Sequence, residues 1–447
     1  MNVNEAINRL KAIQPTTNAC VTIIEDDVKT HEGVLSDVPI ALKDNVITKG
    51  ILTTGGSKLL SNYIPPYNAT IVDKLKQAGG VIVAKTSLDE LGMGGTGTAS
   101  FNGPVRNPFD LTRQAGGSSS GSAVVVAAGA VDIAIGSDTG DSVRKPASYV
   151  GVVGTKPTYG RISRYGIIPY ASSLDHVGYF TRDVRLAALM CDVLSGQDKM
   201  DHTSLPFPST TIAPSLQDNV KGKVYGVFKE VLDAIDHPQT LKHFDAVCRA
   251  LESKGAIIKT ISMNETLLRT CLPTYYIIAN CEATANHSNL TGVNFGLTQE
   301  GDDVESIMTN TRTHGFGPLI RKRFVIGSYG LKDENQDKLF RKAQKVRRVI
   351  VNEYNRMLSE CDGLIAPATT SVAPLLEGAN MNVLSNAHLI AENYMVLSNF
   401  SGAPSITVPI MPVDGLPHGI NLTCKIEDES TMFQLALAIE TCVKEGL

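Results

Sequence analysis

The sequence lacks the features of a membrane, disulfide-bonded or metal-binding protein. Its longest apolar run, residues 123–131, ends at Asp132, whereas a transmembrane helix needs about 20 apolar residues. The first twenty residues have neither the apolar core of a signal peptide nor the Arg- and Ser-rich composition of a transit peptide. The eight cysteines form no C-x-x-C pair and lie scattered in apolar segments. We therefore expect no membrane insertion, no metal site and reduced thiols in the core.

Positive charge and nucleotide-binding motifs are also scarce. The formal net charge is −4 and neither half of the chain is strongly basic, which argues against an independent nucleic-acid-binding protein. Neither G-x-x-x-x-G-K-[ST] nor H-E-x-x-H occurs, so the usual phosphate loop and zinc-protease helix are absent. We therefore expect no cofactor in this chain.

Helical and strand patterns do alternate along the sequence, which predicts an α/β fold with a sheet covered by helices. No clean linker divides the chain, so we expect one large domain over residues 1–447 that begins with a short N-terminal segment, 1–38. Two stretches of poor periodicity, 196–222 and 296–320, are predicted to be surface excursions. The expected helices are 69–80, 239–255, 334–360 and 430–446 (the last capped by Ser430), and the expected strands are 81–84, 256–261, 362–367, 405–411 and 419–426.

Two glycine-rich motifs match known patterns only formally. "GMGGTG", 92–97, fits G-x-G-x-x-G, but the preceding "TSLDEL" reads as a capped helical start rather than the strand that a dinucleotide site needs. "GSSSG", 117–121, fits a nucleophile elbow that would make Ser119 reactive. That elbow also needs a preceding strand, and "NPFDLTRQA", 107–115, is predicted to be a loop. Both motifs are therefore interpreted as structural glycine loops.

Three other segments together predict a catalytic site. "VPIALKDN" reads as a buried strand that delivers Lys43. A buried lysine must be neutral or paired, and the alternative reading is a plain salt bridge with Asp44. "GGSSSGSAVVVAAGA" leads serines into a small-residue helix. "GSDTGDSVRKPAS" presents Ser142 on a glycine turn after an apolar strand, although a simple turn is the alternative, and the nearest histidine in sequence is His176. A serine nucleophile, a bridging serine and a neutral lysine base form the Ser–Lys variant of the catalytic triad.

These segments and the following "GTKPTYGRISRYGIIPYASSLDHVG" resemble the amidase signature family from about Pro39 to the C-terminus. The resemblance implies a large mixed sheet flanked by helices. It also implies that Lys43 is the base, Ser118 the cis-peptide serine of a proton relay and Ser142 the nucleophile. The implied oxyanion hole consists of the backbone amides of Thr139, Gly140, Asp141 and Ser142.

Within the family, "TYYIIANCEATANHSNLTGVNFG", "IRKRFVIGSYG" and "KAQKVR" resemble the glutaminase (A) subunits of glutamyl-tRNA(Gln) amidotransferases. This implies that glutamine is the substrate and that Tyr275, Arg323 and Glu392 hold its α-groups. Ammonia would then pass to a B-type subunit that uses ATP and Mg²⁺ and makes most contacts to Glu-tRNA(Gln), with a further small subunit in the complex. The alternatives are a stand-alone amidase on a small amide and a catalytically weak scaffold subunit.

The chain departs from the family pattern at several positions. Asp141 stands where the family usually has glycine, so its carboxylate either lies near the oxyanion or pairs with Lys145. Ser120 also replaces a usual glycine, and Glu392 replaces a usual aspartate. With the short N-terminal stretch, these replacements predict a mitochondrial, fungal-type form on the matrix side, with the cytoplasm as the alternative.

Overall fold

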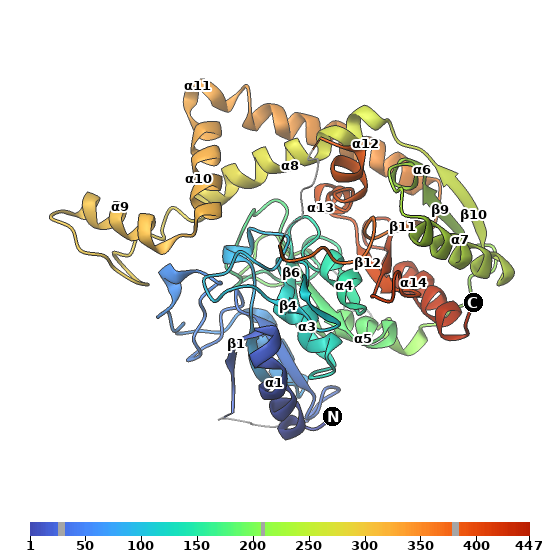
Figure 1. Cartoon of the computed structure of the whole chain (residues 1–447), viewed down its shortest axis with the longest axis horizontal. Coiled ribbons are helices and arrows are strands. Elements are labelled where there is room, and N and C mark those ends of the chain that lie inside the picture. The colour runs from blue at the N-terminus through green and yellow to red at the C-terminus, as the bar shows by residue number, and fades with distance from the viewer. Residues whose placement is uncertain (26–31, 207–210, 378–383) are drawn as a thin grey trace.

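The computed structural model describes residues 1–25, 32–206, 211–377 and 384–447 (Figure 1). Within these residues, eleven strands form one mixed sheet, which confirms the predicted α/β fold of a single domain. Their order across the sheet is β1 (Cys20–Ile23), β3 (Val81–Thr86), β2 (Pro39–Lys43), β6 (Ile133–Asp138), β8 (His176–Thr181), β7 (Val153–Lys156), β12 (Ser405–Pro409), β13 (Gly419–Thr423), β11 (Gly363–Pro367), β9 (Val224–Phe228) and β10 (Ile257–Ile261).

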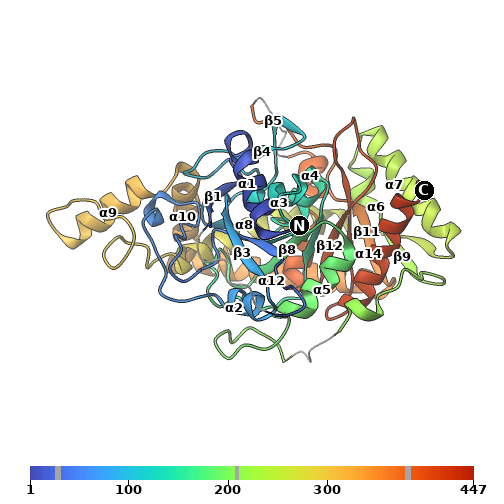
Figure 2. The ribbon, with the colours of Figure 1, turned by 90° about the horizontal axis from the view of Figure 1, so that it is seen from below.

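Helices cover both faces of this sheet (Figures 1 and 2). They are α1 (Val3–Thr17), α2 (Thr70–Gln77), α3 (Ser120–Ala127), α4 (Arg144–Val150), α5 (Val184–Leu194), α6 (Lys229–Asp233), α7 (Pro238–Ser253), α8 (Glu265–Asn286), α9 (Val304–Gly315), α10 (Pro318–Leu331), α11 (Asp333–Gln336), α12 (Phe340–Ser359), α13 (Val396–Ser401) and α14 (Glu429–Lys444). Shorter 3₁₀ turns span Lys58–Leu60, Glu90–Gly92 and Ala213–Ser215, and a π-helical turn spans Ala387–Ala391. No helix of the described chain combines the length and apolar character needed to cross a bilayer.

The alternation of side chains along each strand decides which helices it meets. Ile40 and Leu42 of β2 pack in the core formed with α2, α5, α7 and α14, whereas Ala41 packs in the core formed with α1, α3 and α4. In β11, Ile365 faces the first of these cores and Leu364 faces a third core under α8, α12 and α13. Every residue of β2, β3, β6 and β11 is buried, as expected for strands with helices on both faces.

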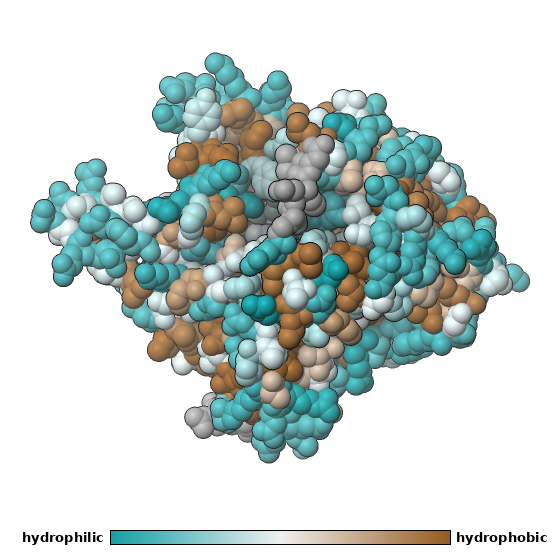
Figure 3. Space-filling model, viewed as in Figure 1, coloured by the Kyte–Doolittle hydropathy of each residue, from teal (hydrophilic) through white to brown (hydrophobic). Residues whose placement is uncertain are grey.

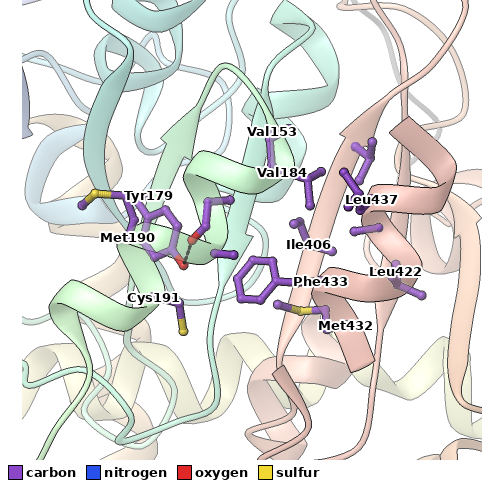
Figure 4. Close-up of a cluster of buried hydrophobic side chains, with 14 of the residues drawn as sticks. Val153, Tyr179, Val184, Met190, Cys191, Ile406, Leu422, Met432, Phe433 and Leu437 are labelled. Carbon is purple, nitrogen blue, oxygen red and sulfur yellow. Dashed lines mark hydrogen bonds between the residues drawn. The ribbon is translucent and has the colours of Figure 1, made fainter. Parts of the chain in front are cut away.

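The core under α5 and α14 joins the two halves of the sheet (Figure 4). Phe433 of α14 lies between Ile406 of β12 and the side chains of α5, and the Tyr179 hydroxyl donates to the Ala187 carbonyl at 3.0 Å. This hydrogen bond satisfies a phenol that has no exposed surface.

Strands β3, β2 and β6 are parallel neighbours, and this pairing places the sequence motifs together. The carboxyl ends of parallel strands meet at one edge of a sheet, so Lys43 at the end of β2 lies next to the last residues of β6, where its Nζ donates to the Ser137 hydroxyl. The serine-rich segment enters α3, which packs against β6, so it reaches the same edge.

Three predictions about secondary structure are wrong. Ser430 is not a cap, because α14 begins at Glu429 and the Asp428 side chain accepts the Thr431 amide. The predicted helix 334–360 is divided into α11 and α12. The predicted loop 107–115 contains a hairpin of β4 (Arg106–Asn107) and β5 (Asp110–Gln114). Pairing of β5 with residues 373–376, including Gln114 N to Pro374 O at 2.9 Å, supports this hairpin.

The segment 296–320 extends from the molecule as an arm that contains α9 (Figure 1). Asp303 and Ser306 form a capping box at its start, and Thr311 and Gly315 are its buried residues. The arm is largely hydrophilic on the face that Figure 3 shows. With so little surface buried, no apolar stripe is needed, which explains the poor periodicity. Residues 26–31 of the N-terminal segment and 207–210 of the segment 196–222 lie outside the described residues.

Candidate functional site

Lys43 is the centre of the site and has no exposed surface. Its Nζ donates to Oγ of Ser118 at 2.8 Å, of Ser119 at 2.9 Å and of Ser137 at 2.9 Å. The alternative of a pair with Asp44 is excluded, because the Asp44 carboxylate lies 3.0 Å from Lys85 Nζ in a separate buried ion pair. Lys43 therefore contacts hydroxyl groups, which can exchange protons with it, instead of a carboxylate that would hold it charged.

Burial lowers the pKa of Lys43 from 10.5 to about 7, although the negative charges of Asp89, Asp138 and Asp175 act to raise it. Removing an ammonium group from water penalises its charged form, and hydroxyl partners compensate only in part. A substantial fraction of Lys43 is thus neutral near pH 7 and able to accept a proton.

Ser118 follows a cis peptide bond, Gly117–Ser118, and Ser119 is the N-cap residue of α3. The Ser118 carbonyl accepts the Asp89 amide at 3.2 Å. Ser119 Oγ donates to the Ser137 carbonyl at 3.0 Å, and its backbone amide donates to the Ser142 carbonyl at 3.2 Å. The structure thus places Lys43 in direct contact with Ser118, and Ser142 adjoins this pair through the hydrogen bond from Ser119 to its backbone carbonyl.

A buried ion pair fixes the turn that carries Ser142. Arg144 and Asp138 are both fully buried, and Arg144 Nη2 lies 2.9 Å from Asp138 Oδ1. The same guanidinium donates to the Gly140 carbonyl at 2.8 Å and to Asn399 Oδ1 at 2.7 Å. Burial acts to raise the pKa of the Asp138 carboxyl, but the Arg144 charge outweighs it and holds that pKa well below its usual range. Asp138 is therefore a permanent anion that anchors the turn.

Hydrogen bonds also hold two further residues of the turn, Thr139 and Asp141. The Thr139 hydroxyl donates to Asp175 Oδ1 at 2.7 Å, and the Asp141 carbonyl accepts the Lys145 amide at 2.9 Å. The backbone amides of residues 139–142 donate no hydrogen bond to any other described residue. This leaves a cluster of donors of the kind that binds a developing oxyanion.

The departure at Asp141 is resolved in favour of an ion pair. Its Oδ2 lies 2.8 Å from Lys145 Nζ, and Glu392 Oε2 lies 3.6 Å from the same nitrogen. Burial acts to lower the pKa of Lys145, but Asp141 and Glu392 outweigh it and raise it. Glu392 also accepts the Thr370 amide at 2.9 Å. The two acids and one lysine carry a net charge of about −1.

A cavity of about 380 Å³ connects this cluster with the other predicted binding residues. Gly140, Tyr275, Arg323 and Glu392 all line it. A side chain at position 140 would meet the Tyr275 ring at 3.2 Å, so the glycine there permits the tyrosine to approach the turn. Arg323 lies over the rings of Tyr170 and Tyr276 and donates to the Tyr170 hydroxyl.

Arg323 lines this cavity, and its described hydrogen bonds do not use all of its donors. Its Nε is buried and has no hydrogen-bond partner among the described residues. The cavity therefore presents a guanidinium on one wall and a net negative cluster on another, which matches the separated charges of an α-amino acid.

A second cavity, of about 300 Å³, is lined in part by Ser137, which contacts Lys43. It shares no lining residue with the first cavity. Asn45, Ser137, Thr139 and His176 line it. His176 Nδ1 donates to the Leu174 carbonyl at 2.7 Å, and burial holds its pKa well below the usual value. His176 is thus neutral and lines the wall of this cavity. Within the described residues it makes no hydrogen bond to Lys43, whose Nζ donates to three serine hydroxyls instead.

The sequence did not reveal four contributors to the site. Ser137 and Ser119 contact Lys43 directly, whereas the sequence marks Ser119 only through the formal elbow pattern. Asn399 and Arg144 hold the turn across more than 250 residues of sequence. An arginine among the small residues of "GSDTGDSVRKPAS" is the local sequence signal for Arg144. Nothing near Asn399 in the sequence marks that residue.

A family model described as amidase matches residues 2–433. The chain belongs to the amidase family. The site described above occupies the segments that carried the resemblance, so the amidase assignment and the geometry agree.

Several amidase relatives are glutamyl-tRNA(Gln) amidotransferase A subunits. That of Caldanaerobacter subterraneus subsp. tengcongensis is 38% identical over 451 residues, which cover 98% of this chain and 92% of the relative. That of Methanosarcina acetivorans is 41% identical over 414 residues, which cover 93% and 86%. The solved A subunit from Thermotoga maritima is 33% identical with a TM-score of 0.82, and the match covers 99% of this chain and 94% of that chain.

Other solved amidases share the fold equally well. The peptide amidase of Stenotrophomonas maltophilia is 25% identical with a TM-score of 0.84, over 99% of this chain and 93% of that chain. Structural similarity therefore does not separate the branches of the family, whereas sequence identity favours the A subunits.

The Asp141–Lys145 pair should stabilise the protein more than an exposed pair does. Asp141→Asn leaves the nearly buried Lys145 with Glu392 alone, so we expect a loss of about 1–3 kcal/mol of unfolding free energy, seen as a lower thermal midpoint. Asp245→Asn is the matched control, because it removes the same i,i+4 partner from Arg249 where the two side chains are 61% and 66% exposed. Such a pair contributes about 0–1 kcal/mol. Equal shifts for the two variants would contradict the assigned ion pair.

Proposed function

We propose that this chain is the glutamine-hydrolysing A subunit of an amidotransferase that converts Glu-tRNA(Gln) to Gln-tRNA(Gln). The observation that carries the proposal is the placement of Arg323, Tyr275 and the Asp141–Lys145–Glu392 cluster on one cavity next to the Ser142 turn. The identity of 38–41% to A subunits over more than nine-tenths of this chain supports the same choice.

In the proposed reaction, Ser142 is the nucleophile, Ser118 relays its proton and neutral Lys43 accepts it. Ser142 Oγ attacks the side-chain amide carbon of glutamine, and the amides of residues 139–142 receive the oxyanion. The proton returns through the same relay to the leaving nitrogen, and ammonia departs from a glutamyl ester of Ser142. Water then attacks the ester, releases glutamate and restores the serine.

The α-groups of glutamine are assigned to the two charged walls of the cavity. Arg323 grips the α-carboxylate with its unused donors, Tyr275 contributes its hydroxyl, and Glu392 receives the α-ammonium within the net negative cluster. Lys145 neutralises Asp141, so the acid beside the nucleophile does not face the oxyanion as a free charge. This weakens the alternative of an inactive scaffold.

The proposed product explains the need for partners. Ammonia in water becomes ammonium, which is not a nucleophile, so it must reach an acceptor held in a second subunit. We assign ATP, Mg²⁺ and most tRNA contacts to a B-type subunit, with a further small subunit in the complex. A location in the mitochondrial matrix is part of this proposal, with the cytoplasm as the alternative, and the replaced glycines at positions 120 and 141 support it.

The relay predicts a hierarchy of losses. Ser142→Ala should abolish glutamine hydrolysis, and Lys43→Ala and Ser118→Ala should each lower kcat by about 10³-fold or more because the three groups act as a unit. Ser122→Ala is the matched control, because this buried α3 serine donates to the Ile135 carbonyl and does not contact Lys43. Ammonia release by the purified complex is the measurement. Substantial release by Ser142→Ala would refute the mechanism.

The base also predicts a pH dependence. Lys43 accepts a proton only when neutral, and its pKa is about 7. Glutamine hydrolysis should therefore rise with pH through about 7 and level off above it. The profile of kcat/KM, recorded with thermal stability over the same range, checks this. A profile that falls or stays flat through pH 7 while the protein remains folded would show that another group is the base.

The amidotransferase assignment is tested in the complex with the ATP-using subunit. Arg323→Ala should raise KM for glutamine by about 10- to 100-fold through loss of a charge-assisted contact, while amidation of Glu-tRNA(Gln) driven by ammonium chloride continues. Arg321→Ala, an exposed position on the same helix, is the matched control. Glutamine hydrolysis at full rate by the isolated chain, unaffected by charged tRNA, would instead favour a stand-alone amidase.

A further inference from the structure

Glu90 is a buried acid that the proposed mechanism does not use. It is 4% exposed and begins the 3₁₀ turn Glu90–Gly92. Its Oε1 accepts the Ser57 hydroxyl at 2.6 Å, and its Oε2 accepts the Gly317 amide at 3.0 Å. Burial raises the pKa of this carboxyl to about 7, and the two hydrogen bonds oppose that shift. A carboxylate in such a place is unfavourable unless it makes contacts that the fold needs.

One of these contacts is at the start of the helix that carries Arg323. Gly317 is the N-cap residue of α10, and it supplies no side chain to cap that end. Glu90 places its carboxylate there from a position 227 residues away in sequence. A negative charge at a helix N-terminus is favourable because of the helix dipole. A Cβ at position 317 would lie 2.7 Å from Glu90 Oε2, so the glycine is what permits this approach.

The residue before Glu90 is tied to the catalytic network. The Asp89 amide donates to the Ser118 carbonyl at 3.2 Å. The Asp89 carboxylate accepts the amides of Gly97 at 3.1 Å and Ala99 at 2.9 Å, and the Glu90 amide donates back to the Ala99 carbonyl. Residues 89–90 therefore contact Ser118 on one side and α10 on the other.

The position of α10 matters because its other strong contacts are to α8. Gly327 packs so closely that a Cβ there would lie 2.1 Å from the Asn280 carbonyl oxygen. Since α8 carries Tyr275, the two helices form a unit that holds both Tyr275 and Arg323. This unit lies toward the arm and away from the parallel strands (Figure 1). Arg323 is six residues beyond Gly317, about 9 Å along the helix axis, so a shift at the helix start is carried to its guanidinium.

We propose that Glu90 is a positioning residue that fixes α10, and with it Arg323, at the right distance from the Ser118–Ser142 centre. Glu90 does not line the cavity and does not touch the reacting atoms. It acts through Arg323, so its effect falls on recognition of the substrate α-carboxylate. The inference rests on the proposed binding role of Arg323.

The test uses Glu90→Gln in the assembled complex. We expect KM for glutamine to rise about tenfold with kcat nearly unchanged, because the neutral amide no longer places negative charge at the start of α10, and a shifted guanidinium weakens binding while the relay stays intact. Butanamide, which is glutamine without its α-groups, should be hydrolysed with unchanged kcat/KM. In the Arg323→Ala background, Glu90→Gln should change KM no further, since the two residues lie in one chain of contacts.

Two further variants keep the test decisive. Gly317→Ala displaces the carboxylate from the other side, and it should reproduce the KM increase even if Glu90→Gln folds poorly. Ser57→Ala removes the partner of the other oxygen and keeps the α10 contact, so its KM should change less than threefold, a cut-off well below the expected tenfold. Unchanged KM in both Glu90→Gln and Gly317→Ala, an additive effect with Arg323→Ala, or equal losses on butanamide would overturn the inference. A wild-type complex that shows no saturable glutamine hydrolysis would instead overturn the proposed function.

Discussion

An ammonium group without access to water is the constraint on which this site depends. Lys43 is placed at the end of a strand that is buried on both faces, where a charged amine is unfavourable. Three serine hydroxyls surround it, and no carboxylate lies within ion-pair distance in the described residues. The contrast with Lys85 on the adjacent strand is instructive, because that buried lysine is paired with Asp44. Two neighbouring buried lysines thus have different chemistry because their partners differ.

A second buried charge pair makes the turn that carries Ser142 depend on the whole fold. Arg144 joins Asp138 and Gly140 to Asn399, and it also donates to the Met395 carbonyl. The turn comes from the first third of the chain, whereas Met395 and Asn399, which Arg144 contacts, come from the last third. The turn is therefore held in shape only when both halves of the sheet are assembled, which the core around Phe433 achieves (Figure 4). This arrangement lets the backbone amides of residues 139–142 stay without an acceptor among the described residues.

The sequence predicts those parts of the site whose cause is local. A buried strand that ends in lysine, a serine-rich helix start and a glycine turn are visible as patterns, and parallel strand pairing brings them together. The sequence offers Lys145 as one of two alternatives for Asp141, four residues away. The contacts of Glu90 with Gly317 and of Arg144 with Asn399 are not visible, because each partner lies on an element distant in sequence. The β4–β5 hairpin was missed for the same reason, since residues 373–376 complete its pairing. The predicted N-cap of α14, Ser430, lies only two residues from the observed N-cap, Asp428, because aspartate and serine near a helix start are both good caps.

In the proposed function, chemistry and specificity are supplied by different parts of this fold. Lys43, Ser118 and Ser142 come from β2, the start of α3 and the turn after β6, all next to the parallel strands. The walls of the cavity come from α8, α10 and the segment around Glu392, which lie outside that part of the sheet. Solved relatives with TM-scores of 0.82–0.84 include an amidotransferase A subunit and a peptide amidase. A common relay can serve such different proteins if the surrounding helices alone change. The contact between Glu90 and α10 then has a clear physical purpose, because two separately built parts of the site need a rigid connection to act on one substrate.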